Sequence, residues 1–271
     1  MGGDQVEGRR AVRELLAAGH RPVHEVWMAE DLDPSPVLDE IERLAARRHA
    51  RLQVVPRRRL EAAARTDAPQ GVMARAGSLP ETDLDDLCRT RRGAAPFLVV
   101  FDGVTDPHNL GSLLRSAECA GVTGVVVPRH RAAHVTPTVT KVAAGAIEHL
   151  DMALVPGIPN ALQRITQAGV TTIGLDASAP MSLFALSEGH GGVDVTGPLA
   201  LVIGAEGKGL APLTRRRCAV LVSIPQHGTI ESLNVASAGA VAFFALARTR
   251  AGRADGPVAA GGRSTNDTVA P

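Results

Sequence analysis

The sequence predicts an α/β protein built from two α/β units in succession. Strand-like and helix-like segments alternate along most of the chain, which is the pattern of a parallel, doubly wound sheet. The runs FLVVF (97–101) and GVVV (124–127) are continuously apolar, as strands buried on both faces of a sheet are. Apolar residues make up 45% and charged residues 21% of the 271 residues, which is typical of a globular chain and excludes a disordered or collagen-like one.

The first unit spans residues 5–77. Its first predicted helix is EGRRAVRELLAAG, which has aliphatic residues on one face and ends on Gly19. VHEVWM is predicted to be a strand, and residues 37–49 repeat their apolar side chains at a helical period. LQVV and GVMARA are predicted to be further strands. The pattern indicates a small α/β domain.

The second unit spans residues 96–250. Its first helix is predicted to start at Asp106, the N-cap, with Pro107 in the first turn, and to end at Gly121. The remaining predicted elements are a helix near 139–148, strand MALV, a helix over 160–168, strands TTIGL and LALVI, a glycine-rich loop, a short helix through 215–217, strand AVLVSI and a helix over 233–250. The second unit is therefore predicted to be a parallel, doubly wound sheet.

Two segments lie outside these units. Residues 78–95 lose the periodicity and are predicted to be a linker with one short helix around Leu84 and Leu87. Residues 251–271 hold glycine, alanine and polar residues without any period, so we expect a disordered tail.

No membrane segment, secretory signal or metal site is predicted. The apolar or small-residue run at 235–247 falls short of the roughly 20 residues that span a bilayer. The start, MGGDQVEGRR, has no apolar core behind its charges. Cys88, Cys119 and Cys218 show no CxxC or Cys/His spacing, and the nine histidines show no metal-ligand spacing. These features predict a cytoplasmic protein with inert thiols.

Positive charge is concentrated in the first unit. Residues 43–65 hold eight arginines against one acid, Glu61, a local charge of +7 in a chain whose net charge is +1. Such a block marks either a phosphate-binding or nucleic-acid-binding face or a solvated helix face. Arginine supplies 27 of the 29 basic residues, which suggests codon bias, and with five Phe, one Trp and no Tyr few side chains can stack on bases.

Common nucleotide and catalytic motifs are absent from the second unit. GAEGKG (204–209) fits neither the phosphate loop GxxxxGK[ST] nor the dinucleotide fingerprint GxGxxG. HExxH, GxSxG and EF-hand patterns are also missing. A nucleotide-dependent α/β enzyme is therefore disfavoured.

Three loops follow strands at the expected carboxyl edge of the second sheet, where ligands of open α/β sheets bind. They are residues 102–115, 204–209 and 224–237. These loops hold the polar candidates Asn109, Arg115, Glu206, Ser232 and Asn234. Arginine is suited to phosphate, and the others can hold polar ligand groups. The alternative for the two asparagines is helix capping.

The three stretches DPHNLGSLLRSAECAG, LVIGAEGKGL and IPQHGTIESLNVASAGAVAFF resemble, in order and spacing, the three motifs of the SpoU (TrmH) family of RNA ribose methyltransferases in the SPOUT superfamily. The resemblance covers residues 97–248. EGRRAV and APQGVMA resemble that family's small, ribosomal-protein-like substrate-binding domain. The resemblance implies a deep trefoil knot in the second unit, a homodimer with the last helix at the interface, and S-adenosylmethionine as cofactor. By motif position, the implied cofactor contacts are Gly204, Ile224, Leu233 and, more weakly, Leu175.

The implied reaction moves a methyl group from S-adenosylmethionine to a ribose 2′-hydroxyl, with a guanosine in large-subunit (23S) ribosomal RNA as the first substrate to consider. A tRNA 2′-O-methyltransferase and an antibiotic-resistance rRNA methyltransferase share the motifs and stay open. The competing class is a non-catalytic RNA-binding protein that has lost the motif residues, all of which are present here.

The resemblance and the chemistry together assign provisional roles to the candidates. Arg115 would work with an RNA phosphate, either by taking the proton of the 2′-hydroxyl or by stabilising the alkoxide and positioning the phosphate, and the second role is favoured because a guanidinium stays protonated. Glu206 stays open as the base, and Asn109 would orient Arg115 or the ribose. Ser232 and Asn234 would hold the substrate nucleotide, and Glu206 would fix the loops. In the first unit, Arg57, Arg58 and Arg59 are predicted to contact RNA phosphates.

Overall fold

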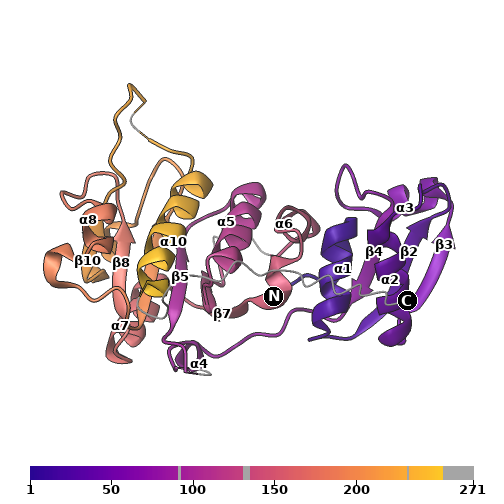
Figure 1. Cartoon of the computed structure of the whole chain (residues 1–271), viewed down its shortest axis with the longest axis horizontal. Helices are drawn as coiled ribbons and strands as arrows, with labels where there is room; N and C mark the ends of the chain where they lie inside the picture. The colour runs from indigo at the N-terminus through magenta and orange to yellow at the C-terminus, as the bar shows by residue number, and fades with distance from the viewer. Residues whose placement is uncertain (91–92, 131–134, 231, 253–271) are drawn as a thin grey trace, which may run out of the picture.

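A computed structural model describes residues 1–90, 93–130, 135–230 and 232–252. The predicted tail, apart from Ala251 and Gly252, lies outside the described residues. The described chain forms two sheets, each covered by helices on both faces, and Figure 1 shows the two units side by side. We refer to residues 1–77 as the N-terminal unit and to residues 78–252 as the C-terminal unit. Among the described residues, no helix is long and apolar enough to cross a membrane.

The N-terminal unit is a four-stranded mixed sheet with strand order β1-β4-β2-β3. Its strands are β1 (Gln5–Glu7), β2 (Val23–Ala29), β3 (Arg51–Val55) and β4 (Val72–Ala76), and its helices are α1 (Arg9–Ala18), α2 (Pro36–Arg47) and α3 (Arg57–Ala63). Side chains along β2 alternate between the two faces, so Val26 and Met28 pack under α1 and α2, while Trp27 and Ala29 pack under α3. Helix α3 and strand β1 are absent from the predicted elements because both are too short to show a period.

The C-terminal unit is a six-stranded, fully parallel sheet with strand order β10-β8-β9-β5-β6-β7. Its strands are β5 (Phe97–Asp102), β6 (Gly124–Pro128), β7 (Asp151–Val155), β8 (Thr171–Leu175), β9 (Leu199–Gly204) and β10 (Val220–Val222). The predicted parallel, doubly wound sheet is confirmed. Its buried strands carry apolar residues on both faces, as the sequence pattern requires.

Helices cover both faces of this second sheet. They are α4 (Leu84–Leu87), α5 (Pro107–Cys119), α6 (Pro137–Val142), the 3₁₀ helix η1 (Ala146–His149), α7 (Ile158–Gln167), α8 (Leu183–Ser187), the 3₁₀ helix η2 (His190–Gly192), α9 (Pro212–Arg217) and α10 (Val235–Ala251). Helices α5, α6, α8 and α10 share one apolar cluster, and α4 and α7 share the other. The short helix predicted in the linker is α4, and Leu84 and Leu87 are both buried against the second sheet.

The helix predicted near residues 139–148 is wrong as a single element. Helix α6 ends at Val142, Ala144 and Gly145 adopt left-handed conformations (φ 52° and 88°), and η1 follows. A Cβ at Gly145 would lie 2.4 Å from Cβ of Glu14 on α1, so the close approach of the two units requires glycine here. Because the cause lies 131 positions away in the sequence, local periodicity could not reveal this break.

A buried ion pair joins the two units. The Arg21 guanidinium donates to both carboxylate oxygens of Glu148 on η1, at 3.0 and 2.6 Å, and to the carbonyl oxygens of Gly3 and Gly77. Both charged side chains are only 2% exposed. Nearby, the amide of Gly3 donates to the carbonyl oxygen of Val135 at 3.0 Å. These contacts hold the units in one arrangement.

Replacing Glu148 by alanine is expected to lower the free energy of unfolding by about 3–5 kcal/mol, because the Arg21 guanidinium would remain buried without its counter-charge. Denaturation followed by the fluorescence of Trp27, the single tryptophan, measures the loss. Glu42→Ala removes an exposed carboxylate from α2 and is expected to change stability by less than about 0.5 kcal/mol. A similarly small effect of Glu148→Ala would contradict this view of the pair.

Candidate active site

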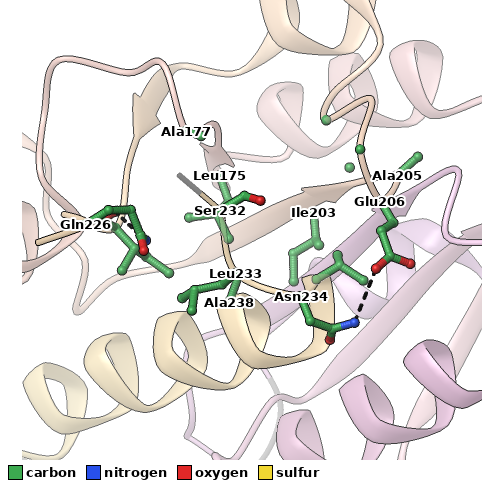
Figure 2. A pocket seen from close by; sticks show the side chains of 15 residues that line it. Leu175, Ala177, Ile203, Ala205, Glu206, Gln226, Ser232, Leu233, Asn234 and Ala238 are labelled. Atoms are coloured by element: carbon green, nitrogen blue, oxygen red, sulfur yellow. Dashed lines mark hydrogen bonds between the residues drawn. The ribbon is translucent and has the colours of Figure 1, made fainter. Parts of the chain in front are cut away.

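A pocket of about 510 Å³ opens beyond the carboxyl ends of β8, β9 and β10 (Figure 2). It is built by the end of β8, the loop after β9, the segment after β10 and the start of α10. Its lining residues are Leu175, Ala177, Ile203–Gly207, Gly209, Ile224, Gln226, Ser232–Val235 and Ala238. This edge is where open parallel sheets bind ligands, because successive loops converge there.

The loop after β9 forms one wall of the pocket and folds back on itself. The Ala205 amide donates to the carbonyl oxygen of Gly209 at 3.0 Å, and the Gly209 amide donates back to Ala205 at 2.8 Å. Gly207 and Gly209 have φ values of 71° and 64°, which favour glycine. A Cβ at Gly204 would lie 2.2 Å from the carbonyl carbon of Gly209. Glycine at position 204 is therefore a requirement of the loop's own packing.

Asn109, Glu206 and Asn234 form one hydrogen-bonded cluster at the pocket. The Asn109 Nδ2 donates to Oε2 of Glu206 at 2.9 Å. The Asn234 Nδ2 donates to Oδ1 of Asn109 at 3.0 Å and to Oε1 of Glu206 at 3.3 Å, the contact drawn in Figure 2. Three segments from β5–α5, β9–α9 and β10–α10 are thus tied together. A carboxylate suits this position because it only accepts, whereas both asparagines present N–H donors.

Helix capping explains part of this cluster. Asn234 is the N-cap of α10, since its Oδ1 accepts from the amides of Ala236 and Ser237. The N-cap of α5 is instead Asp106, as predicted, and this leaves the Asn109 side chain available to Glu206. The capping alternative thus holds for Asn234 but does not hold for Asn109.

The remaining pocket candidates are exposed or half-buried. Ser232 is exposed and Leu233 is 43% exposed, and both precede α10 at the pocket (Figure 2). Ile224 and Leu175 line the same wall. The apolar lining also includes Ile203 and Ala238, which sequence reasoning missed because they lie inside a strand and a helix that the core already explains.

Arg115 lies outside this pocket. It is exposed on α5, six residues after Asn109, which corresponds to about 9 Å along a helix axis. It lines a separate cleft between the two units together with Lys141 and residues of α1. The structure thus brings Asn109, Glu206, Ser232 and Asn234 together at one pocket but does not bring Arg115 to it.

The predicted phosphate contacts on α3 have different surroundings. Arg57 pairs with Asp31 at 2.7 Å and with Glu61 at 3.8 Å, and its hydrogen bond lowers the pKa of Asp31 below the ordinary value. Arg59 lies over the Trp27 ring, 4.9 Å from its centroid. Arg58 is exposed, and no hydrogen bond or ion pair of it is found among the described residues. Their contact with RNA stays a prediction.

Burial disfavours the ionised, nucleophilic form of the three thiols. Burial raises the pKa of Cys88 to about 11 and that of Cys218 to about 12. Burial also raises the pKa of Cys119, although this side chain is exposed on α5. Within the described ranges, no three His, Cys, Asp or Glu side chains gather closely enough to hold a metal ion.

Comparison with known proteins identifies related chains over nearly the full length. The 23S rRNA (guanosine-2′-O-)-methyltransferase RlmB of Ralstonia nicotianae is 41% identical over 246 residues, 90% of this chain and 94% of that protein. RlmB of Shewanella oneidensis is 37% identical over 250 residues, 91% of this chain and 98% of that protein. The crystal structure of the SpoU methyltransferase AviRb from Streptomyces viridochromogenes in complex with AdoMet matches with a TM-score of 0.73 and 28% identity, over 91% of this chain and 90% of that one.

Two family models cover most of the chain. Residues 5–82 match the RNA 2′-O ribose methyltransferase substrate-binding family. Residues 96–244, more than half of the chain, match the SpoU rRNA methylase family. The resemblance predicted from the three motifs is confirmed, and so is the predicted enzyme class. The chain belongs to the SpoU rRNA methylase family.

Proposed function

We propose that this protein transfers a methyl group from S-adenosylmethionine to the ribose 2′-hydroxyl of a guanosine in large-subunit ribosomal RNA. The observation that carries the proposal is the pocket at the carboxyl edge, where all three family motifs meet in one hydrogen-bonded cluster. The RlmB relatives, which are named as 23S rRNA guanosine methyltransferases and align over 90% of the chain or more, support the substrate.

The pocket lining fits the cofactor. Leu175, Ile224 and Leu233 offer aliphatic surface for a planar adenine, and Gly204, Gly207 and Gly209, which have no side chain, line the pocket with backbone atoms. The AdoMet complex of AviRb supports this choice of cofactor. When bound, S-adenosylmethionine supplies a methyl group that is already activated by a sulfonium centre. The protein's task is then to orient the attacking hydroxyl and to handle its proton.

The chain's own residues divide this task. Glu206 accepts from Asn109 and Asn234 and so fixes the three loops around the pocket. Ser232 is exposed at the pocket and can donate to the substrate nucleotide. Arg115, a cation on the same helix as Asn109 but outside the pocket, holds a phosphate of the RNA and so positions the ribose for attack. A guanidinium stays protonated, so this electrostatic role is favoured over that of a general base.

Several features of the family's organisation belong to the same proposal. The chain divides into a ribosomal-protein-like RNA-binding domain (5–77), a linker (78–95) and a SPOUT methyltransferase domain (96–250). The methyltransferase domain carries a deep trefoil knot. This is supported by the strand order, in which β10 and β9 flank β8 and the chain then returns to pack α10 on α5 and β9. An rRNA substrate supports a cytoplasmic location.

The protein works as a homodimer through α10. One face of this helix is buried, yet Val241 and Phe244 on the other side are 37% and 52% exposed. A second copy would remove this apolar surface from water. Phe244→Glu is expected to convert a dimer into a monomer in sedimentation, and an unchanged sedimentation coefficient would contradict the assignment of this interface.

Changing Arg57, Arg58 and Arg59 together to alanine is expected to weaken RNA binding and to flatten its salt dependence, because fewer counterions are released. Titrations of labelled RNA at several salt concentrations measure both effects. Cofactor affinity, measured by calorimetry, should not change, since α3 lies in the other unit from the pocket. An unaltered affinity and salt slope would mean that these arginines form only a solvated face.

Methyl transfer from labelled S-adenosylmethionine to unmodified 23S rRNA transcript tests the proposed function. A ribose 2′-O-methyl group blocks alkaline cleavage at its nucleotide, so the product is expected as an alkali-resistant dinucleotide that begins with guanosine. Label in tRNA alone would favour the alternative tRNA substrate. RNA binding without label in either RNA would favour a non-catalytic RNA-binding protein.

A further inference from the structure

A second cleft, of about 810 Å³, lies between the two units. Its N-terminal wall comes from the β1–α1 turn, α3 and neighbouring loops, and its C-terminal wall comes from α5 and α6. Figure 1 shows α1 facing α6 across the junction of the units. Arg115, which the first pocket leaves out, lines this cleft.

The cleft is lined by cations from both units. They are Arg9, Arg10, Arg57, Arg115 and Lys141. Among the described residues, no hydrogen bond or ion pair engages the side chains of Arg10, Arg115 or Lys141. These three come from three different helices, α1, α5 and α6.

The one acidic residue in this lining is turned to other partners. Glu7 is fully buried, and its carboxylate accepts from Gln5 Nε2, from the amides of Arg65 and Thr66 and from the Thr66 hydroxyl. Its charge is therefore held by hydrogen bonds within the N-terminal unit. Arg57 is paired with Asp31 and Arg9 donates to Gln70, so Arg10, Arg115 and Lys141 are the cations that remain to attract an anion from outside.

The two walls are held in place before any ligand arrives. The Arg21–Glu148 pair and the Gly145–Glu14 approach lock α6 and η1 against the N-terminal unit. A Cβ at Gly8 would lie 3.6 Å from Cγ of Lys141, so the stem of this lysine rests at the start of α1. The spacing of the cations across the cleft is thus set by the fold, which reduces the entropic cost of binding.

We propose that this cleft binds the RNA backbone on its way from the N-terminal unit to the methylation pocket, with Arg10, Lys141 and Arg115 each holding a phosphate. The inference rests on the proposed function and deepens it, because it assigns Arg115 a phosphate to bind. We call Arg10, Lys141 and Arg115 together the phosphate track. Cations on three helices of two units suit a chain of phosphates better than one small anion. The roughly 9 Å along α5 between Arg115 and Asn109 leads from this track to the pocket.

The double variant Arg10→Ala/Lys141→Ala tests the track. Each lost phosphate contact on a single strand lowers the slope of log affinity against log salt by about 0.7, so the slope should fall by about 1.4. This corresponds to about 25-fold weaker RNA binding at 0.1 M salt. The affinity for S-adenosylmethionine should be unchanged, because neither residue lines that pocket.

The matched control is Arg89→Ala/Arg164→Ala, which removes the same charge. These arginines belong to the α4 and α7 side of the second sheet, opposite to α5 and α6. The control is expected to keep the wild-type salt slope. An equal loss in both double variants would mean that net charge alone governs binding, and this would overturn the assignment of the cleft.

Amine footprinting gives a second readout that does not depend on methylation. Lys141 and Lys208 are the only lysines, so acetylation at each is resolved by mass spectrometry. Unmodified 23S rRNA transcript is expected to lower acetylation of Lys141 several-fold, and S-adenosylmethionine alone should not. If the wild type methylates the transcript while Lys141 keeps its reactivity and the double variant keeps its salt slope, the cleft inference fails. If no RNA is methylated but Lys141 is protected, the proposed function fails and the cleft stands.

Discussion

Arg115→Lys is expected to lower the single-turnover rate of methyl transfer by about 10²-fold while cofactor affinity stays at the wild-type value. Lysine keeps the charge but loses the planar fork that grips a phosphate through two N–H groups. A phosphate held even about 1 Å away from its proper place can cost a rate factor of this size. Cofactor affinity is spared because Arg115 does not line the cofactor pocket.

Rapid mixing at saturating cofactor and RNA measures the rate, and calorimetry measures cofactor affinity. Arg164→Lys, on α7 at the opposite face of the sheet, serves as the conservative control and should be near normal. Near-normal transfer by Arg115→Lys and Arg115→Ala would remove Arg115 from the mechanism. Glu206 would then become the leading candidate for handling the proton.

Gly204→Val should abolish measurable binding of S-adenosylmethionine. The structure supplies the reason: even a Cβ at this position would come within 2.2–2.4 Å of the backbone of Gly209 and Leu210. The loop must move, and its move displaces the wall of the pocket. Helix content by circular dichroism is expected to persist, because the loop lies at the edge of the sheet rather than in its core.

Gly157→Ala provides the control for this glycine. Nothing lies within 4 Å of a Cβ at Gly157, and its φ of −163° suits any residue. This variant should bind the cofactor normally. If Gly204→Val bound S-adenosylmethionine with wild-type affinity, the cofactor could not lie against this loop as proposed.

The layout of the C-terminal unit was predictable because its strands are strongly apolar and each is followed by a polar loop. Asp106 followed by Pro107 marks the start of α5, and the structure confirms this cap. The sequence predicted that Asn109 and Glu206 lie at the same edge of the sheet, but it did not predict the hydrogen bond between them. Parallel topology brings the loops to one edge, but the contact itself depends on strand order, which no local pattern encodes.

What sequence reasoning missed depends on contacts between the two units. The break at Gly145 exists because α1 approaches there, and the position of Arg115 in a cleft depends on the docking of the N-terminal unit. Lys141 carried a weak signal, as one of two lysines in an arginine-rich chain, but nothing local connects it with Arg10. Such placements require the assembled tertiary structure.

Mapping of ribose 2′-O-methylation in ribosomal RNA, from cells with and without the gene, tests whether this protein methylates large-subunit rRNA. We expect one guanosine of large-subunit rRNA to be methylated in the parent strain and unmethylated in the deletion strain. Methylation should return with the wild-type gene and not with the Gly204→Val variant. An identical methylation map of large-subunit rRNA in the two strains would contradict the proposed function.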